Sequence, residues 1–72
     1  MDYLTKLRAL REDRDFSQKQ VADLLGVAQT TYSQYELGKR ALPIEYLVIL
    51  CRFYGVSSDW LLGLEGKESP KE

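Results

Sequence analysis

Apolar residues recur in the N-terminal part of the chain at steps of three and four positions, the period of a helix that buries one face. Leu4, Leu7 and Leu10 follow this spacing. The pattern therefore predicts a first helix over residues 2–13. No segment of the sequence has the two-residue alternation of a half-buried strand, so the pattern favours an all-α protein.

A capping box marks the start of a second helix. Ser17 stands at the N-cap position and Gln20 follows three residues later, so each side chain can accept a hydrogen bond from the backbone of the other. We expect this helix to begin at Gln18. It should end at Gly26, because glycine readily adopts the left-handed conformation that terminates helices.

Three more helices are predicted by similar signals. The third runs from about 28 to 37 and stops at Gly38. The fourth is the most apolar; Pro43 suits its first turn and Gly55 ends it. The fifth has Ser57 as its N-cap and is one or two turns long. Together these elements predict an all-α fold, a compact five-helix bundle.

A chain of 72 residues has room for one domain and not for two hydrophobic cores. We expect that domain to cover residues 1–64. Residues 65–72 are polar and contain glycine, serine and proline, so we expect them to form a flexible tail or the start of a linker.

The chain has one cysteine, Cys51, and no histidine. These counts exclude an intramolecular disulfide and argue against a zinc site of the usual type, so we expect no metal and no cofactor. Without histidine or a glycine-rich phosphate loop there is no catalytic constellation, and we expect no enzyme activity. The sequence contains neither an export signal nor a membrane-spanning run, which favours a cytoplasmic protein without a membrane partner.

Charge alone does not indicate a nucleic-acid partner. Ten Lys and Arg residues stand against eleven Asp and Glu residues, for a net charge of −1. A strongly basic domain would be the usual electrostatic signature of DNA binding. The evidence must therefore come from where particular residues are placed.

Two short helices joined by a turn of about three residues are typical of a helix-turn-helix motif. Gln18–Val27 (QKQVADLLGV) and Tyr32–Arg40 (YSQYELGKR) resemble the DNA-binding domains of the phage repressor and Cro type, also called the Xre family. The resemblance extends from Leu4 to about Gly63 and includes Pro43 after the basic loop. It implies a lambda-repressor-like DNA-binding domain in which the third helix reads the major groove.

The outer side of the third helix is polar, and four of its side chains are candidates for reading bases. Glutamine can pair with adenine through two hydrogen bonds, and the threonine methyl group can pack on thymine. The resemblance implies that these positions contact bases or nearby phosphates. The alternative is an ordinary solvated helix face. The four candidates are Gln29, Thr30, Ser33 and Gln34.

Four polar or basic side chains beside this helix are candidates for binding phosphates, which supply most of the affinity for duplex DNA. The resemblance implies that Gln18 binds a phosphate and braces Gln29. Each basic residue taken alone is more simply a solvated surface charge, and only their clustering favours binding. The candidates are Gln18, Lys19, Lys39 and Arg40.

The resemblance also implies an ion pair between Arg11, near the end of the first helix, and Glu36, near the end of the third. We interpret this pair as structural, because it would tie the reading helix to the first helix. One residue departs from the family pattern: Ala28 stands where Ser or Thr usually caps the reading helix. The missing cap should cost about 1 kcal/mol of helix stability.

One small domain makes few DNA contacts, and the resemblance implies a homodimer whose two reading helices meet half-sites about one helical turn apart. The fourth and fifth helices hold more large apolar side chains than one small core needs. We expect part of this surplus to form the dimer interface; alternatively, the fifth helix folds back and covers it. The interface candidates are Phe53, Trp60, Leu61 and Leu64.

These observations favour a bacterial or phage-encoded transcriptional regulator, a repressor rather than an activator. It would bind a palindromic DNA operator as a homodimer in the cytoplasm and join the nucleoid when bound. No small-molecule ligand is indicated. Two alternatives stay open: a DNA-binding part of a longer regulator, and a helical protein-interaction module that does not bind DNA.

Overall fold

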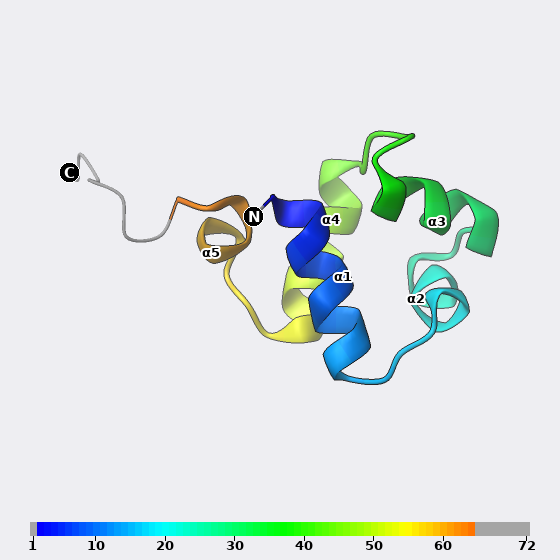
Figure 1. Cartoon of the computed structure of the whole chain (residues 1–72), viewed down its shortest axis with the longest axis horizontal. Coiled ribbons are helices and arrows are strands. Elements are labelled where there is room, and N and C mark those ends of the chain that lie inside the picture. Colours follow the sequence, from blue (N-terminus) through cyan, green and yellow to red (C-terminus); the bar gives the residue numbers. More distant parts are fainter. Residues whose placement is uncertain (1, 65–72) are drawn as a thin grey trace.

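The computed structural model describes residues 2–64, and within this range the chain consists of helices and short connections (Figure 1). The predicted all-α, five-helix fold is confirmed. The tail expected at 65–72 lies outside the described residues. None of the described helices has the length and apolar character needed to cross a lipid bilayer. The helices are α1 (Tyr3–Asp13), α2 (Gln18–Leu25), α3 (Gln29–Leu37), α4 (Ile44–Tyr54) and α5 (Ser58–Leu62).

The helix ends follow local signals in the sequence. The predicted capping box is formed: Ser17 Oγ accepts from the backbone N–H of Gln20 at 3.0 Å, and Gln20 Oε1 accepts from the backbone N–H of Ser17 at 2.8 Å. Gly26 ends α2 in the left-handed conformation, with φ of 75°. Pro43 differs from the prediction. Its ψ of 146° is extended, so Pro43 is the N-cap of α4 and the helical backbone begins one residue later, at Ile44.

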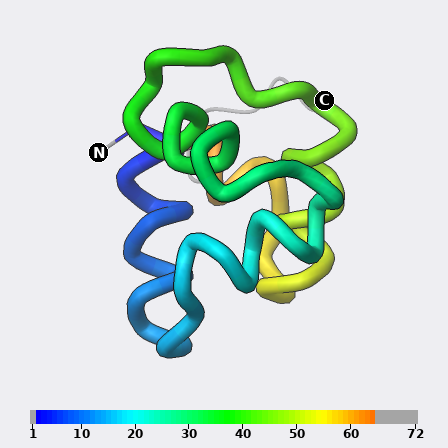
Figure 2. Tube along the Cα trace, turned by 90° about the vertical axis from the view of Figure 1, so that its right-hand side faces the viewer, coloured from blue at the N-terminus to red at the C-terminus, as the bar shows by residue number. Residues whose placement is uncertain are grey.

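The core lies where the inward sides of the five helices meet. Tyr32 of α3 is the largest fully buried side chain, and Leu7, Leu50 and Leu61 are equally inaccessible. Helix α3 packs against α1 and α2, while α5 packs against α1 and α4. In Figure 2, α2 and α3 lie toward the viewer, with α1 and α4 to the left and right of them. The α2–α3 pair therefore forms one side of the molecule.

The position of α5 corrects one prediction about the dimer interface. Leu61 is 0% exposed, so it belongs to the core and cannot contact another molecule. The reason is that α5 folds back onto α1, where Lys6 Nζ donates to the carbonyl oxygen of Trp60 at 2.7 Å and lies 4.8 Å from the centre of its ring. Trp60 is half-buried, whereas Phe53 and Leu64 remain 41% and 57% exposed.

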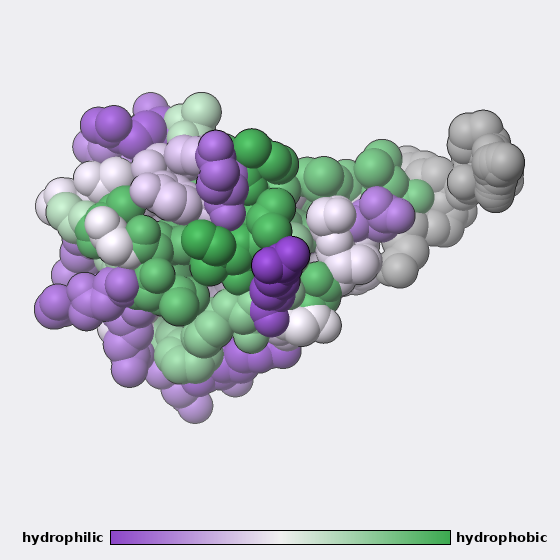
Figure 3. Space-filling model, turned by 180° about the vertical axis from the view of Figure 1, so that it is seen from behind, coloured by the Kyte–Doolittle hydropathy of each residue, from purple (hydrophilic) through white to green (hydrophobic). Residues whose placement is uncertain are grey.

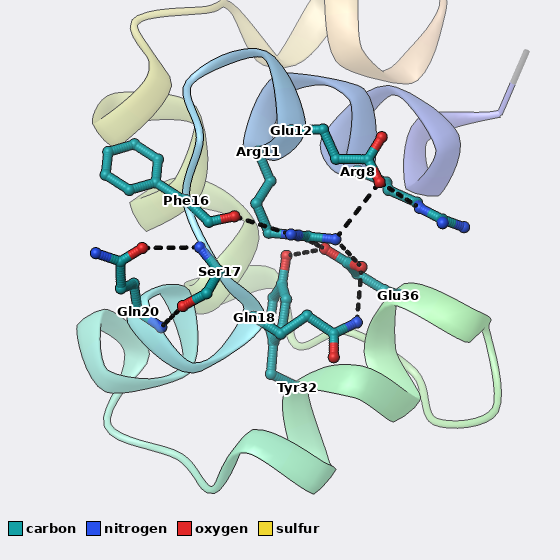
Figure 4. Close-up of polar contacts among 9 residues, drawn as sticks. All are labelled: Arg8, Arg11, Glu12, Phe16, Ser17, Gln18, Gln20, Tyr32 and Glu36. Atoms are coloured by element: carbon teal, nitrogen blue, oxygen red, sulfur yellow. Dashed lines mark hydrogen bonds and ion pairs between the residues drawn. The ribbon is translucent and has the colours of Figure 1, made fainter.

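An ion pair between α1 and α3 holds α3 in place (Figure 4). Arg11 Nε donates to Glu36 Oε2 at 2.7 Å, and Arg11 Nη2 donates to Glu36 Oε1 at 3.3 Å. Arg11 Nη1 also donates to the carbonyl oxygen of Phe16 at 2.9 Å. The two side chains are only 12% and 5% exposed. The expected pair is therefore present, and it joins α1 both to α3 and to the loop before α2.

Two further side chains donate to the same carboxylate. Tyr32 Oη lies 2.7 Å from Glu36 Oε2, and Gln18 Nε2 lies 3.1 Å from Glu36 Oε1. Burial raises the pKa of Glu36, but the hydrogen bonds from Arg11, Tyr32 and Gln18 outweigh burial and leave this pKa below its ordinary value. The hydrogen bond to Glu36 in turn raises the pKa of Arg11. Both groups are therefore charged at neutral pH.

Leu61→Ala is expected to destabilise the fold by about 2–5 kcal/mol, because it removes a fully buried side chain and leaves a cavity. The matched control is its neighbour in α5, Leu62→Ala, since Leu62 is 44% exposed. The control should change the free energy of unfolding by less than about 1 kcal/mol. Urea denaturation of both variants measures the difference. Equal losses would show that α5 does not bury Leu61.

Glu36→Gln is expected to lower the free energy of unfolding at pH 7 by about 2–4 kcal/mol, because it removes the close anionic partner of Arg11 in a poorly solvated site and leaves only the exposed Glu12 carboxylate, 3.9 Å away. The folded-state pKa of Glu36 is depressed. The ionised Glu36 carboxylate therefore stabilises the wild type fully at pH values above the unfolded-state pKa of about 4.3. This stabilisation is lost as the pH falls through the folded-state pKa.

Urea titrations at a series of pH values measure this effect. The stability gap between wild type and Glu36→Gln should narrow as the pH is lowered from about 7 to about 3, because the wild-type carboxyl then also becomes neutral. A gap of constant size across that range would contradict the role of the ionised carboxylate.

Candidate nucleic-acid interface

A turn of three residues connects α2 to α3. Gly26, in its left-handed conformation, donates its N–H to the carbonyl oxygen of Asp23 at 3.1 Å, and the N–H of Val27 donates to that of Ala22 at 3.0 Å. These bonds satisfy the last carbonyl groups of α2 and redirect the chain. The two helices consequently meet at a large angle (Figure 1), which is the geometry of a helix-turn-helix motif.

Helix α3 has a buried side and an outward side. Tyr32 and Tyr35 point into the core and are 1% and 6% exposed. The single charged side chain of α3, Glu36, is turned inward to Arg11. The four predicted base-reading side chains occupy the opposite side, the first two exposed and the other two half-buried. This outward face of α3 consists of Gln29, Thr30, Ser33 and Gln34.

Two features of α3 qualify this face. Ala28 is the N-cap residue of α3 and its side chain makes no capping hydrogen bond, as expected from the sequence. At the other end, Leu37 is 61% exposed and adds an apolar group next to the polar face. The outward face is therefore uncharged, with an apolar edge at the C-terminal end of the helix.

Gln18 lies at the start of α2, as predicted, but its amide has a different partner from the expected one. Its Nε2 donates to Glu36 Oε1 at 3.1 Å, and among residues 2–64 it forms no hydrogen bond to Gln29. The ionised carboxylate is a stronger acceptor than a neutral amide, which explains the preference. An amide nitrogen has two hydrogens, so one remains for a further acceptor.

The three basic candidates lie at opposite ends of the motif. Lys19 follows Gln18 on α2 and pairs with Asp23 one turn later, with Nζ to Oδ2 at 3.3 Å. Both side chains of this pair are more than 60% exposed, so the pair contributes little stability and Lys19 can exchange its partner. Lys39 and Arg40 are exposed in the loop that follows α3.

Sequence reasoning missed one contact in this region. Arg40 Nε donates to Gln34 Oε1 at 3.0 Å, so a predicted phosphate-binding residue and a predicted base-reading residue are joined. The only sequence signal was Gly38, which predicts a reversal of the chain after α3. A spacing of six residues across a turn does not by itself specify a contact between side chains.

A family model described as helix-turn-helix matches residues 7–61 of the chain. The uncharacterized HTH-type transcriptional regulator YobD of Bacillus subtilis is 39% identical over 69 residues, covering 96% of this chain and 62% of YobD. The HTH-type transcriptional regulator AnsR of the same organism is 40% identical over 62 residues, 86% of this chain and 53% of AnsR. The cryptic phage CTXphi transcriptional repressor RstR of Vibrio cholerae is 41% identical over 54 residues, 75% of this chain and 49% of RstR.

The chain thus spans between 49% and 62% of the length of these three relatives. No solved structure gives a significant match. All three relatives are named as transcriptional regulators or repressors and none as an enzyme, in agreement with the expectation from the sequence. The family model covers most of the chain. The chain therefore belongs to the helix-turn-helix family, and its predicted resemblance to the phage repressor and Cro type is confirmed.

Proposed function

We propose that this protein is a sequence-specific regulator of transcription that inserts α3 into the major groove of duplex DNA. The observation that carries the proposal is the outward face of α3. It is solvent-accessible and uncharged, and it is made of amide and hydroxyl groups that match the hydrogen-bonding edges of bases. A face of this kind gives sequence discrimination rather than general attraction to phosphate.

Phosphate contacts would come from the two ends of the motif. Gln18 and Lys19 open α2, while Lys39 and Arg40 follow α3. Donors on both sides of the outward face can reach the two backbones that border a major groove and fix the register of α3 within it. With a net charge of −1, the protein should bind non-specific DNA weakly at physiological salt.

We propose further that the regulator is a homodimeric repressor acting on a palindromic operator. A two-fold dimer presents two copies of α3, which matches the symmetry of a palindrome and doubles the contacts available to one small domain. Repression requires only that the bound protein exclude polymerase. One of the relatives, RstR, is named as a transcriptional repressor. Such a regulator would act in the cytoplasm, at the nucleoid.

An exposed apolar face on α4 is the surface we propose for dimerisation. Figure 3 shows apolar side chains gathered on the side of the molecule behind the view of Figure 1. The partner on this face would be a second copy of the chain, because a palindromic operator has two equivalent half-sites. In a two-fold symmetric contact the same apolar patch is buried on both copies. Exposed Leu64 and half-buried Trp60 are further candidates on the segment after α4. The apolar residues on the exposed side of α4 are Ile44, Val48, Ile49 and Phe53, between 38% and 64% exposed, and the exposed charges Glu45 and Arg52 lie among them.

A second possibility is that the described domain works as the DNA-binding part of a longer regulator. The observation that favours it is coverage, since the chain matches only 49% to 62% of its relatives. In that arrangement a further segment would supply oligomerisation or signal sensing.

The DNA-binding proposal predicts that selection on random duplex DNA at near-physiological salt enriches a palindromic motif. Gln29→Ala should relax one position in each half-site by about 1–3 kcal/mol, because it removes the groups that discriminate a base there. Arg8→Ala is the control: Arg8 is exposed on α1 and pairs with Glu12, so its variant should keep the wild-type motif.

Failure to enrich any motif, together with no salt-sensitive duplex binding, would contradict DNA recognition. The helical protein-interaction module would then be the better explanation of the fold. A motif without two-fold symmetry would leave DNA binding intact and contradict the homodimer.

The dimer proposal predicts that the wild-type chain sediments as a dimer and that Val48→Glu weakens the dimer by at least about tenfold, because it would remove a carboxylate from water at an apolar contact. Leu24→Glu is the matched control, since Leu24 on α2 and Val48 are 42% and 41% exposed. The control should leave the dissociation constant unchanged. A wild-type chain that remains monomeric would favour the longer-regulator alternative.

A further inference from the structure

The chain reverses direction after α3 and brings Arg40 back beside Gln34. Gly38 has a φ of 76°, a left-handed conformation that L side chains rarely adopt. The backbone N–H groups of Lys39 and Arg40 then both donate to the carbonyl oxygen of Gln34, at 2.9 Å and 3.3 Å. The backbone N–H of Arg40 is therefore hydrogen-bonded to Gln34.

The side chains repeat this link. Arg40 Nε donates to Gln34 Oε1 at 3.0 Å. Two backbone bonds and one side-chain bond thus join the end of α3 to the loop, and the guanidinium group lies beside the amide at the edge of the outward face. In the DNA-free chain the Gln34 amide oxygen therefore already accepts a hydrogen bond from Arg40, at the exposed edge of the face.

This contact changes which bases Gln34 can recognise. To pair with adenine through two bonds, a glutamine uses its oxygen as an acceptor for N6 and its nitrogen as a donor to N7. In this protein the oxygen already accepts from Arg40. Its second lone pair lies beside a full positive charge, which disfavours the approach of another donor such as the adenine amino group.

The polar hydrogens that this bond leaves available on the pair are all donors. Gln34 keeps the two hydrogens of its Nε2, and the guanidinium of Arg40 keeps those of its two terminal nitrogens. Guanine is the base whose major-groove edge carries two acceptors, O6 and N7, and no donor. A donor-only unit therefore matches guanine and mismatches adenine.

We propose that Gln34 and Arg40 act as one specificity-determining unit that selects guanine at the base pair facing Gln34. The inference rests on the proposed function and deepens it, because it assigns a base preference to one position of the site. It also predicts different base preferences for Gln29 and Gln34. Among residues 2–64 the Gln29 side chain forms no hydrogen bond, so its oxygen is open to the adenine pairing expected of a free glutamine.

The test is selection on random duplex DNA with wild type, Gln34→Ala, Arg40→Ala and Lys39→Ala, with affinities for the enriched duplexes measured at fixed salt. The position facing Gln34 is identified as the one whose preference is lost in Gln34→Ala. Wild type should prefer guanine over adenine there by at least about fivefold. Arg40→Ala should reduce that ratio by at least about fivefold and admit adenine, since the amide oxygen is released.

Lys39→Ala is the matched control, because Lys39 is the neighbouring exposed cation and its hydrogen bond to Gln34 comes from the backbone N–H, which alanine keeps. It should lower the affinity for all sequences alike and keep the guanine preference. Circular dichroism should show wild-type helix content in every variant, since the three substituted side chains lie at the surface or are half-buried.

Three outcomes would overturn the inference while leaving DNA recognition in place. They are adenine at the Gln34 position in the wild type, an unchanged base preference in Arg40→Ala, and a Gln34→Ala variant that alters no position. Enrichment of no sequence by the wild type would overturn this inference together with the proposed function.

Discussion

One poorly solvated carboxylate, that of Glu36, sets where α3 lies. It accepts hydrogen bonds from Arg11 on α1, from Gln18 on α2 and from Tyr32 within α3 (Figure 4). Burying a charge is costly unless every part of it is paired, and here three donors from three helices supply the pairing. The arrangement is specific rather than merely attractive, because a shift of any one helix would leave the carboxylate short of a partner.

Local elements of the fold could be predicted from the sequence because their causes are local. The capping box at Ser17 and Gln20, and the glycine at position 26, act over three or four residues, and the structure has α2 where these signals place it. Helical spacing likewise explains the inward side of α3, since Tyr32 and Tyr35 stand three residues apart and are both buried. Pro43 was misplaced by one residue because the same fixed φ suits an N-cap and a first turn.

The features that could not be predicted depend on how distant segments meet. Leu61 and Phe53 are both large apolar residues near the C-terminal end, yet one is 0% and the other 41% exposed. Leu61 is buried because α5 returns to α1, through a Lys6 contact that spans 54 positions, whereas Phe53 lies on α4. The sequence likewise does not show whether the amide of Gln18 bonds to Gln29 or to Glu36. The bond to Glu36 depends on where the fold places that carboxylate.

The division of α3 into two sides explains why its outward face can be polar. A helix of nine residues without an N-cap bond is unstable alone, because nucleation is costly and few backbone bonds repay it. Its stability must come from the inward side, where two tyrosines are buried and Glu36 is anchored. The exposed outward side chains, Gln29 and Thr30, contribute little to folding. They are consequently free to differ between related chains, and a change of base preference need not cost the fold its stability.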